Sequence, residues 1–295
     1  MREAFDTIDG GTMRGILKAG QVREGSFYTA EPGAGPTLWD GLAGADPLHA
    51  AVSAIDEAAE AAKSAAVVDF LARELPEGVV ADLGCGYGRI AKYLLPRRSF
   101  AGYVGVDGSA TMLTLFDQRY QARPAEQRTP LLLLKSGIDR LPIEDASLDA
   151  VFSCAVLLHN PKPGTRAAIA ELLRVLKPGG KVVIVDSFPS RSSLQGLFGT
   201  GYHLVYRLRG RAQSLGPVRY FTRGEIARMF AGFGDVRVFP EGLVTIPKSY
   251  PFLGARLNAA YRRAVYAPVD RVLRRVLPEG AGRVSPQFYN VVARK

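Results

Sequence analysis

The fold is decided by residues 79–94, VVADLGCGYGRIAKYL, which change character halfway along. Residues 79–84 form an apolar run typical of a buried strand, and residues 89–95 have the spacing of a short helix. Gly84, Gly86 and Gly88 stand between them. Glycine adopts backbone angles that other residues resist and leaves room beside the main chain. The stretch therefore predicts a strand, a loop and a helix, with a ligand lying against the loop.

Strands and helices alternate on both sides of this unit. Residues 58–75 have the periodicity of an amphipathic helix, and 109–122, 164–180 and 221–234 are predicted helices, with Ser109 and Thr222 as N-caps. Further strands are predicted at 103–108, 131–135, 148–154, 181–188, 235–242 and 287–295. Short apolar strands separated by helices predict an α/β fold whose parallel sheet is covered on both faces.

The chain is predicted to hold one such domain, residues 61–295, preceded by a cap or lid segment at 1–60. The first segment is rich in Gly and Pro and carries the sole tryptophan, Trp39. Residues 189–220 and 242–285 interrupt the alternation. We expect these two stretches to be basic insertions that contribute to substrate binding.

Composition narrows the class of protein. Two cysteines and three histidines among 295 residues cannot build a disulfide framework, and we expect no metal site. The N-terminus lacks a signal-peptide pattern, and no apolar stretch approaches the roughly 20 residues that a membrane span needs. These features favour a cytoplasmic protein, peripheral at the membrane if its basic part binds lipid.

Positive charge is concentrated late in the chain. Residues 189–295 hold 18 of the 38 Lys and Arg but 5 of the 28 Asp and Glu. Such asymmetry is typical of an anionic partner or surface, and a solvated arginine-rich face explains it as well. Within this part, residues 254–277 form a basic amphipathic segment. Its apolar stripe can lie on an anionic membrane or pack against the domain.

The glycine loop fits a nucleoside cofactor better than a dinucleotide. A dinucleotide fingerprint needs Gly-x-Gly-x-x-Gly, and Arg89 occupies the place of its third glycine. Asp82, at the entrance of the loop, disfavours a pyrophosphate and suits a cationic amine. Asp107 ends the next strand, 19 residues beyond Gly88, where an acid can accept hydrogen bonds from ribose hydroxyls. The NAD-dependent oxidoreductase alternative is therefore the weaker one.

Four motifs together resemble those of class I S-adenosylmethionine-dependent methyltransferases, most closely the small-molecule branch that includes quinone-biosynthesis C-methyltransferases. They are ADLGCGYGRIAKYL (81–94), GVDGSATML (105–113), SLDAVFSCAVLLHN (147–160) and ELLRVLKPGGKVVIVD (171–186). The resemblance covers about residues 60–188 and resumes at 220–234 and 288–295. It implies a Rossmann-like, mostly parallel sheet of seven strands with an antiparallel last strand, an N-terminal helical cap and inserted C-terminal helices. It also implies S-adenosylmethionine as cofactor.

The resemblance further implies roles for the loop residues. Asp82 lies near the methionyl amino group, and Asp107 holds the ribose. The methionyl and ribose side is lined by Gly84, Cys85, Gly86 and Gly88.

On the adenine side, the resemblance implies that Gly108 and Met112 flank the base. The acidic residue that the family commonly has after the third strand is missing, because its position is Gly137. Gly137 and Ile138 then contribute backbone groups, and Asp139 can substitute for the missing carboxylate.

The same resemblance implies a small-molecule acceptor, methylated at oxygen or carbon, such as a lipid-like quinone or a polyketide. Cys154 and Ala155 line the methyl-transfer end. His159 is the candidate general base and substrate contact, although a histidine there can instead order the loop before Pro161. Tyr28, in the cap segment, is a weaker candidate for a substrate contact.

Two other functions stay open at this point. A nucleic-acid methyltransferase would use the basic last third, but the site after the fourth strand reads SCAVLL in place of the Asn/Asp-Pro-Pro-aromatic motif of base-amine enzymes. A non-catalytic cofactor-binding module would retain Gly84 and Asp107 all the same.

Overall fold

The computed structural model describes residues 13, 15–33, 35, 37–45, 57–191, 193, 196, 219–243, 255–269, 272 and 286–295. Most of the predicted insertion at 189–220 and much of that at 242–285 lie outside the described residues. Among those described, no helix is long and apolar enough to cross a membrane.

Nine strands form one sheet in the part of the chain that the structure describes, in the order β1-β2-β5-β4-β3-β6-β7-β9-β8. They are β1 (Val22–Glu24), β2 (Phe27–Thr29), β3 (Val79–Leu83), β4 (Gly102–Asp107), β5 (Leu131–Lys135), β6 (Leu148–Cys154), β7 (Leu176–Pro189), β8 (Asp235–Leu243) and β9 (Pro286–Arg294). From β2 to β7 neighbouring strands are parallel, whereas β9 runs antiparallel to both β7 and β8. The predicted α/β sheet and its antiparallel last strand are confirmed.

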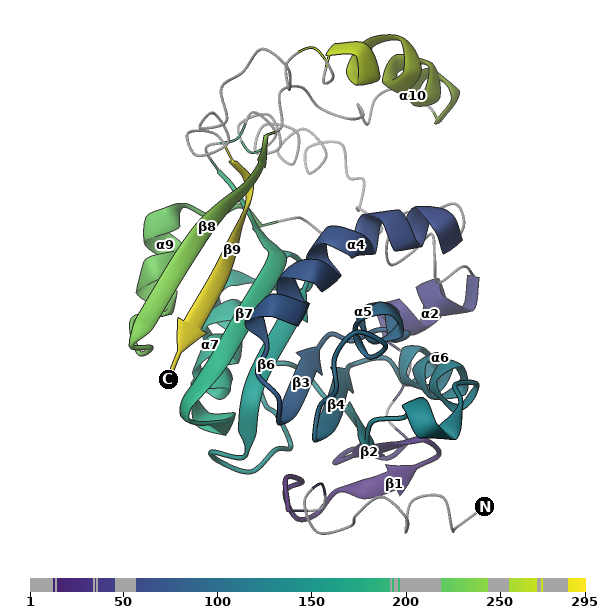
Figure 1. Cartoon of the computed structure of the whole chain (residues 1–295), viewed down its shortest axis with the longest axis vertical. Coiled ribbons are helices and arrows are strands. Elements are labelled where there is room, and N and C mark those ends of the chain that lie inside the picture. The colour runs from purple at the N-terminus through teal and green to yellow at the C-terminus, as the bar shows by residue number, and fades with distance from the viewer. Residues whose placement is uncertain are drawn as a thin grey trace.

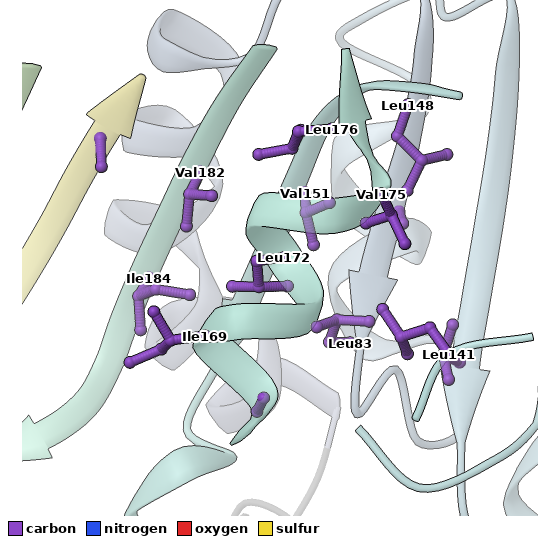
Figure 2. Packing of buried hydrophobic residues seen from close by; sticks show 14 of the residues in the cluster. Leu83, Leu141, Leu148, Val151, Ile169, Leu172, Val175, Leu176, Val182 and Ile184 are labelled. Atoms are coloured by element: carbon purple, nitrogen blue, oxygen red, sulfur yellow. The ribbon is translucent and has the colours of Figure 1, made fainter. Parts of the chain in front are cut away.

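The helices cover both faces of the sheet (Figure 1). One face carries α4 (Glu57–Glu74), α5 (Arg89–Leu94) and α6 (Ala110–Gln121), and the other carries α7 (Lys162–Val175) and α9 (Arg223–Met229). Short apolar strands alternate between the two cores, so that Val79, Ala81 and Leu83 face α7 while Val80 faces α4. Figure 2 shows Ile169, Leu172 and Val175 of α7 among side chains of β3, β6 and β7.

The structure has two more strands than the predicted seven. The additional β1 and β2 form a hairpin around Gly25, which has a φ of 60°, and β2 joins the edge of the sheet beside β5. Each is three residues long, too short for a periodic pattern to stand out in a Gly- and Pro-rich sequence. The hairpin places Tyr28 in the sheet, partly buried against the α7-side core, and not in a lid.

A second difference concerns the segment LKPGG at 176–180. We predicted a helix within 164–180 with Pro-Gly-Gly as its stop signal; α7 ends earlier, at Val175, and residues 176–180 belong to β7. The pairing of β6 with β7 shifts there from Leu148↔Leu176 to Ala150↔Lys181, so the extra residues form a bulge. The N-caps were predicted correctly: Ser109 Oγ accepts from the N–H of Met112, and Thr222 forms a capping box with Glu225.

The order of the strands reverses at β3: β4 and then β5 follow on one side of it, and β6 and then β7 on the other. In open α/β sheets such a switch point opens a crevice at the carboxyl ends of the strands, and ligands bind there. The loop that follows β3 is the glycine loop.

Candidate active site

The three glycines of the loop have different tasks. All three have a positive φ, 70° at Gly84, 53° at Gly86 and 78° at Gly88. A Cβ on Gly84 would lie 2.3 Å from Val156 Cγ2, and one on Gly88 would lie 2.5 Å from Phe116 Cδ2. A Cβ on Gly86 would meet no atom within 4 Å. Gly84 and Gly88 therefore allow close packing within the protein, and Gly86 is the position at which a ligand can approach the backbone.

The carboxylate of Asp107, at the end of β4, ties this loop to the next helix. Its Oδ2 accepts from the N–H of Gly86 at 2.9 Å, and its Oδ1 accepts from the N–H of Ser109 at 2.9 Å. Each oxygen retains a lone pair for a further donor. Gly108 follows Asp107 in the loop after β4, and a Cβ added to it would meet no atom within 4 Å. Burial raises the pKa of Asp107, and the two backbone donors oppose that shift.

Asp82 lies near the end of β3 and is 2% exposed. Burial raises the pKa of its carboxyl to about 7, against a hydrogen bond from Tyr103 Oη at 2.8 Å and the charge of Arg89. The folded protein therefore binds this proton more tightly than the unfolded chain does. The ionised form costs stability increasingly as the pH rises from about 4 to about 7. A cation beside Asp82 would remove that cost.

Arg89, the first residue of α5, has a functional position that we did not predict. Its guanidinium donates to Ser64 Oγ at 3.0 Å and to Cys154 Sγ at 3.5 Å, and its charge interacts with Asp82 and Asp186. In the sequence its place directly after the glycine loop served to exclude a dinucleotide. The same place, directly after the glycine loop, is the signal by which the sequence could have identified it as a candidate site residue.

A buried network supports the loop from the α4 side. Glu60 is fully buried and accepts from Tyr87 Oη at 3.0 Å and Tyr93 Oη at 3.1 Å, with Lys92 Nζ at 3.6 Å. Met112 packs against Tyr87 and is 2% exposed, which makes it a support for the loop in this structure.

Helix α2 (Leu38–Ala45) bridges two of the loops at this edge. Asp40 Oδ1 accepts from Ser109 Oγ at 2.6 Å and from the N–H of Thr111 at 2.9 Å, at the start of α6. These bonds outweigh burial and hold the pKa of Asp40 well below its usual range. The ring of Trp39 meets that of His159 edge-on, with centroids 5.6 Å apart. Since His159 follows β6, and β3 lies between β4 and β6, α2 crosses the carboxyl end of β3.

The remaining candidates lie along the same edge. The backbone after β5 carries Gly137 and Ile138, and Asp139 Oδ1 would lie 2.8 Å from a Cβ on Gly137. Ala155 follows β6 with a φ of 60°. Both cysteines are free and buried, and burial raises the pKa of Cys154 to about 12 against the opposing charge of Arg89. Neither the buried Cys85 nor Cys154 is thus prepared as a thiolate nucleophile.

Within the described residues, no group of three or more His, Cys, Asp or Glu side chains is arranged to hold a metal ion.

A family model and several relatives that match this chain are methyltransferases. The family model described as "Methyltransferase domain" matches residues 81–184. The chain is 32% identical over 180 residues to the demethylmenaquinone methyltransferase of Thermus thermophilus. This alignment covers 61% of this chain and 72% of that protein. It is 36% identical over 128 residues to the demethylmenaquinone methyltransferase of Deinococcus radiodurans, covering 43% of this chain and 49% of that one.

A solved structure shares the fold as well. It is a chain in the complex between the Haloferax volcanii Trm112 methyltransferase activator and a methyltransferase, with a TM-score of 0.53 at 15% identity over 88% of this chain and 98% of that chain. The sheet, the loop and these relatives together define a methyltransferase domain. The chain belongs to the class I S-adenosylmethionine-dependent methyltransferases.

The different tasks of Gly84 and Gly86 can be separated by one methyl group at each. Gly84→Ala adds a clash with Val156 to the strain of a positive φ, and we expect it to lower the free energy of unfolding by about 2–4 kcal/mol. Gly86→Ala adds the strain alone, about 1–2 kcal/mol. Gly86→Ala should instead weaken the binding of S-adenosylhomocysteine by roughly tenfold or more, about 1.4 kcal/mol.

Urea unfolding and calorimetric titration of the two variants check this expectation. Equal losses of stability in both variants, or full affinity in Gly86→Ala, would contradict the assignment.

Proposed function

We propose that this methyltransferase acts on a small hydroxylated ring compound, a lipid-like quinol or a polyketide, and methylates it at carbon or oxygen. The observation that carries the proposal is the bridge made by α2, which brings Trp39 onto His159 beside the end of β6. Two aromatic rings at the acceptor side, packed edge-on, offer a ring face and a ring edge to a ring substrate. The two demethylmenaquinone methyltransferases among the relatives act, by their names, on a quinone, and a third relative is the methyltransferase GfsG of Streptomyces halstedii.

The residues present fit the cofactor. The open approach at Gly86 and Gly108 leaves room for a nucleoside, and the spare lone pairs of Asp107 suit the two ribose hydroxyls. Asp82 suits the α-ammonium group, and Arg89 suits the α-carboxylate because a guanidinium binds carboxylates with two parallel hydrogen bonds. Gly137, Ile138 and Asp139 are the candidates for the adenine edge.

Bound there, the cofactor supplies an electrophilic methyl group on a positively charged sulfur. The protein's contribution is to hold the acceptor in line with that methyl and to exclude water, which can be worth about 7–11 kcal/mol. We assign Cys154 and Ala155 to the wall at the methyl-transfer end and His159 to the acceptor side, where its ring is held by Trp39.

Nucleic acid is the second candidate substrate. A tRNA methyltransferase of Macaca fascicularis is 35% identical over 121 residues, 40% of this chain and 16% of that protein. The basic last third of the chain favours an anionic partner, as noted above. The aromatic bridge over the site and the sequence SCAVLL after Phe152 favour the small molecule.

Mass spectrometry of the acceptors separates the two candidates. The protein is incubated with S-adenosylmethionine and either a short-tailed demethylmenaquinol, kept reduced, or total tRNA. We expect the quinol, and not the RNA, to gain the mass of one methyl group in place of hydrogen. Omission of the cofactor and addition of S-adenosylhomocysteine are the controls. Methylated tRNA with unchanged quinol would overturn the proposal.

We further propose that the basic segment at 254–277 docks on an anionic lipid surface, where a lipid-like acceptor resides. In Figure 1, α10 (Ala255–Tyr261) lies apart from the sheet at the top of the view. Leu257 and Val265 are 60% and 44% exposed, and Val272 beyond them is 56% exposed. Arg256 and Arg263 are exposed in the same stretch. Exposed apolar residues among arginines suit the interface of an anionic membrane.

Co-sedimentation with vesicles checks the lipid surface. The protein should bind phosphatidylglycerol vesicles at low salt, less at high salt, and phosphatidylcholine vesicles weakly, because screening weakens attraction to anionic lipid. The double variant Leu257→Asp/Val265→Asp should lose binding. Val22→Asp is the matched control, since Val22 is 51% exposed in β1, far from α10 in the sequence. Binding by the double variant equal to that of the control would refute the surface.

A further inference from the structure

The carboxyl end of β7 is distorted beside the methyl-transfer end. The pairing of β7 with β9 shifts between Ile184↔Val291 and Phe188↔Tyr289, so that β7 holds extra residues in a bulge. Asp186 lies in the bulge with a φ of 52°, in the left-handed region that side chains rarely adopt. Bulges re-aim side chains next to active sites, and such strain persists where the surroundings enforce it.

Asn290 of β9 enforces this conformation. It is 3% exposed, its Oδ1 accepts from the N–H of Asp186 at 3.1 Å, and its Nδ2 donates to Glu241 Oε2 of β8. The buried amide therefore fixes the backbone of Asp186 from a strand that is remote in the sequence. On the other side, the N–H of Ala155 donates to the carbonyl of Val185 at 3.0 Å, which joins the bulge to the end of β6.

The carboxylate of Asp186 lies close enough to three groups on other elements for their charges to interact. Its charge interacts with Arg89 of α5, Cys154 of β6 and Glu241 of β8, and Asp82 of β3 in turn interacts with Arg89 and Cys154. Among the described residues, none donates a hydrogen bond to this carboxylate. An acceptor with a hydroxyl group can supply that donor.

We propose that Asp186 is a catalytic residue that takes the proton of the acceptor's hydroxyl group during methyl transfer, which rests on the function proposed above. The O–H bond breaks, its electron pair stays on the acceptor, and the proton forms a new bond to a carboxylate oxygen of Asp186. The acceptor's electron pair, on oxygen or on the conjugated ring carbon, then bonds to the methyl carbon, while the bond between that carbon and the donor's sulfur breaks and its electron pair stays on the sulfur. The proton on Asp186 passes to water after the product leaves; with a carbon acceptor, the proton on the methylated ring carbon moves to the oxygen as the ring becomes aromatic again.

The surroundings suit a base for this step. Burial raises the pKa of Asp186 and brings it closer to the operating pH, while Arg89 opposes the shift and favours the ionised form between turnovers. A base whose pKa approaches the operating pH is the efficient one for proton transfer. His159 is the alternative base, and its ring packs edge-on against Trp39 at the acceptor side.

Turnover of the reduced short-tailed demethylmenaquinol gives the first test. Asp186→Asn keeps the shape of the side chain and should lower kcat by about 100-fold or more. It should also lose the rise of kcat with pH through the range in which Asp186 ionises, and recover in part at alkaline pH, where the quinol ionises by itself. Asp235→Asn, the same change at an exposed position of β8, is the matched control, and His159→Gln is the comparison. The proposal would be overturned if His159→Gln lost more kcat than Asp186→Asn and the kcat of Asp186→Asn still rose with pH as in the wild type.

Binding gives a second test that needs no turnover. With S-adenosylhomocysteine present, the wild-type protein should bind the quinol about tenfold or more tightly than the corresponding quinone, which has no hydroxyl to donate. Asp186→Asn should lose this preference and keep its affinity for S-adenosylhomocysteine. Absence of the preference in the wild type, or its persistence in Asp186→Asn, would overturn the role of Asp186. Failure of the protein to bind S-adenosylhomocysteine would instead overturn the function on which the role rests.

Discussion

The site depends on two hydrogen bonds that the carboxylate of Asp107 accepts, from the N–H groups of Gly86 and Ser109. They join the loop after β3, the strand at which the strand order reverses, to the loop after the neighbouring β4. Because both donors are backbone groups, these two hydrogen bonds do not depend on the side chains of the donor residues. Asp40 adds the N-terminal segment to this arrangement through Ser109 and Thr111. Three segments that are separate in the sequence thus meet at this corner of the site.

The site is divided by charge along the edge of the sheet. The side toward β4 and β5 offers backbone groups and Asp107, which suit a sugar and a base. The side toward β6 and β7 gathers Asp82, Arg89 and Asp186, whose charges depend on one another because they are buried together. On this second side, the carboxylate of Asp186 has no hydrogen-bond donor among the described residues. It is the side on which a charged amino-acid group and a reacting acceptor would be held. Under the function proposed above, the nucleoside would therefore bind beside β4 and β5, and methyl transfer would take place beside β6 and β7.

Local signals in the sequence were sufficient for the parallel core, for the glycine loop and for the caps at Ser109 and Thr222. Each of these features depends on a few neighbouring residues. The strands are apolar runs, the loop has a characteristic glycine spacing, and each cap is a hydroxyl residue directly before a helix. The hairpin β1–β2 was missed because three-residue strands carry no period, and the bulge of Asp186 because it is set by Asn290, 104 residues away. The hydrogen bond from Arg89 to Cys154 likewise joins residues 65 positions apart, which no short motif encodes.

Calorimetric titration with S-adenosylhomocysteine, at pH 7 in buffers of different ionisation enthalpy, tests the account most directly. With a pKa of about 7, the buried Asp82 is partly protonated in the free protein. An ammonium group placed beside it favours the carboxylate, so binding at pH 7 should release a fraction of a proton from Asp82. Asp82→Asn should bind without that release. Absence of binding, or binding by the wild type with the same proton balance as Asp82→Asn, would contradict the account.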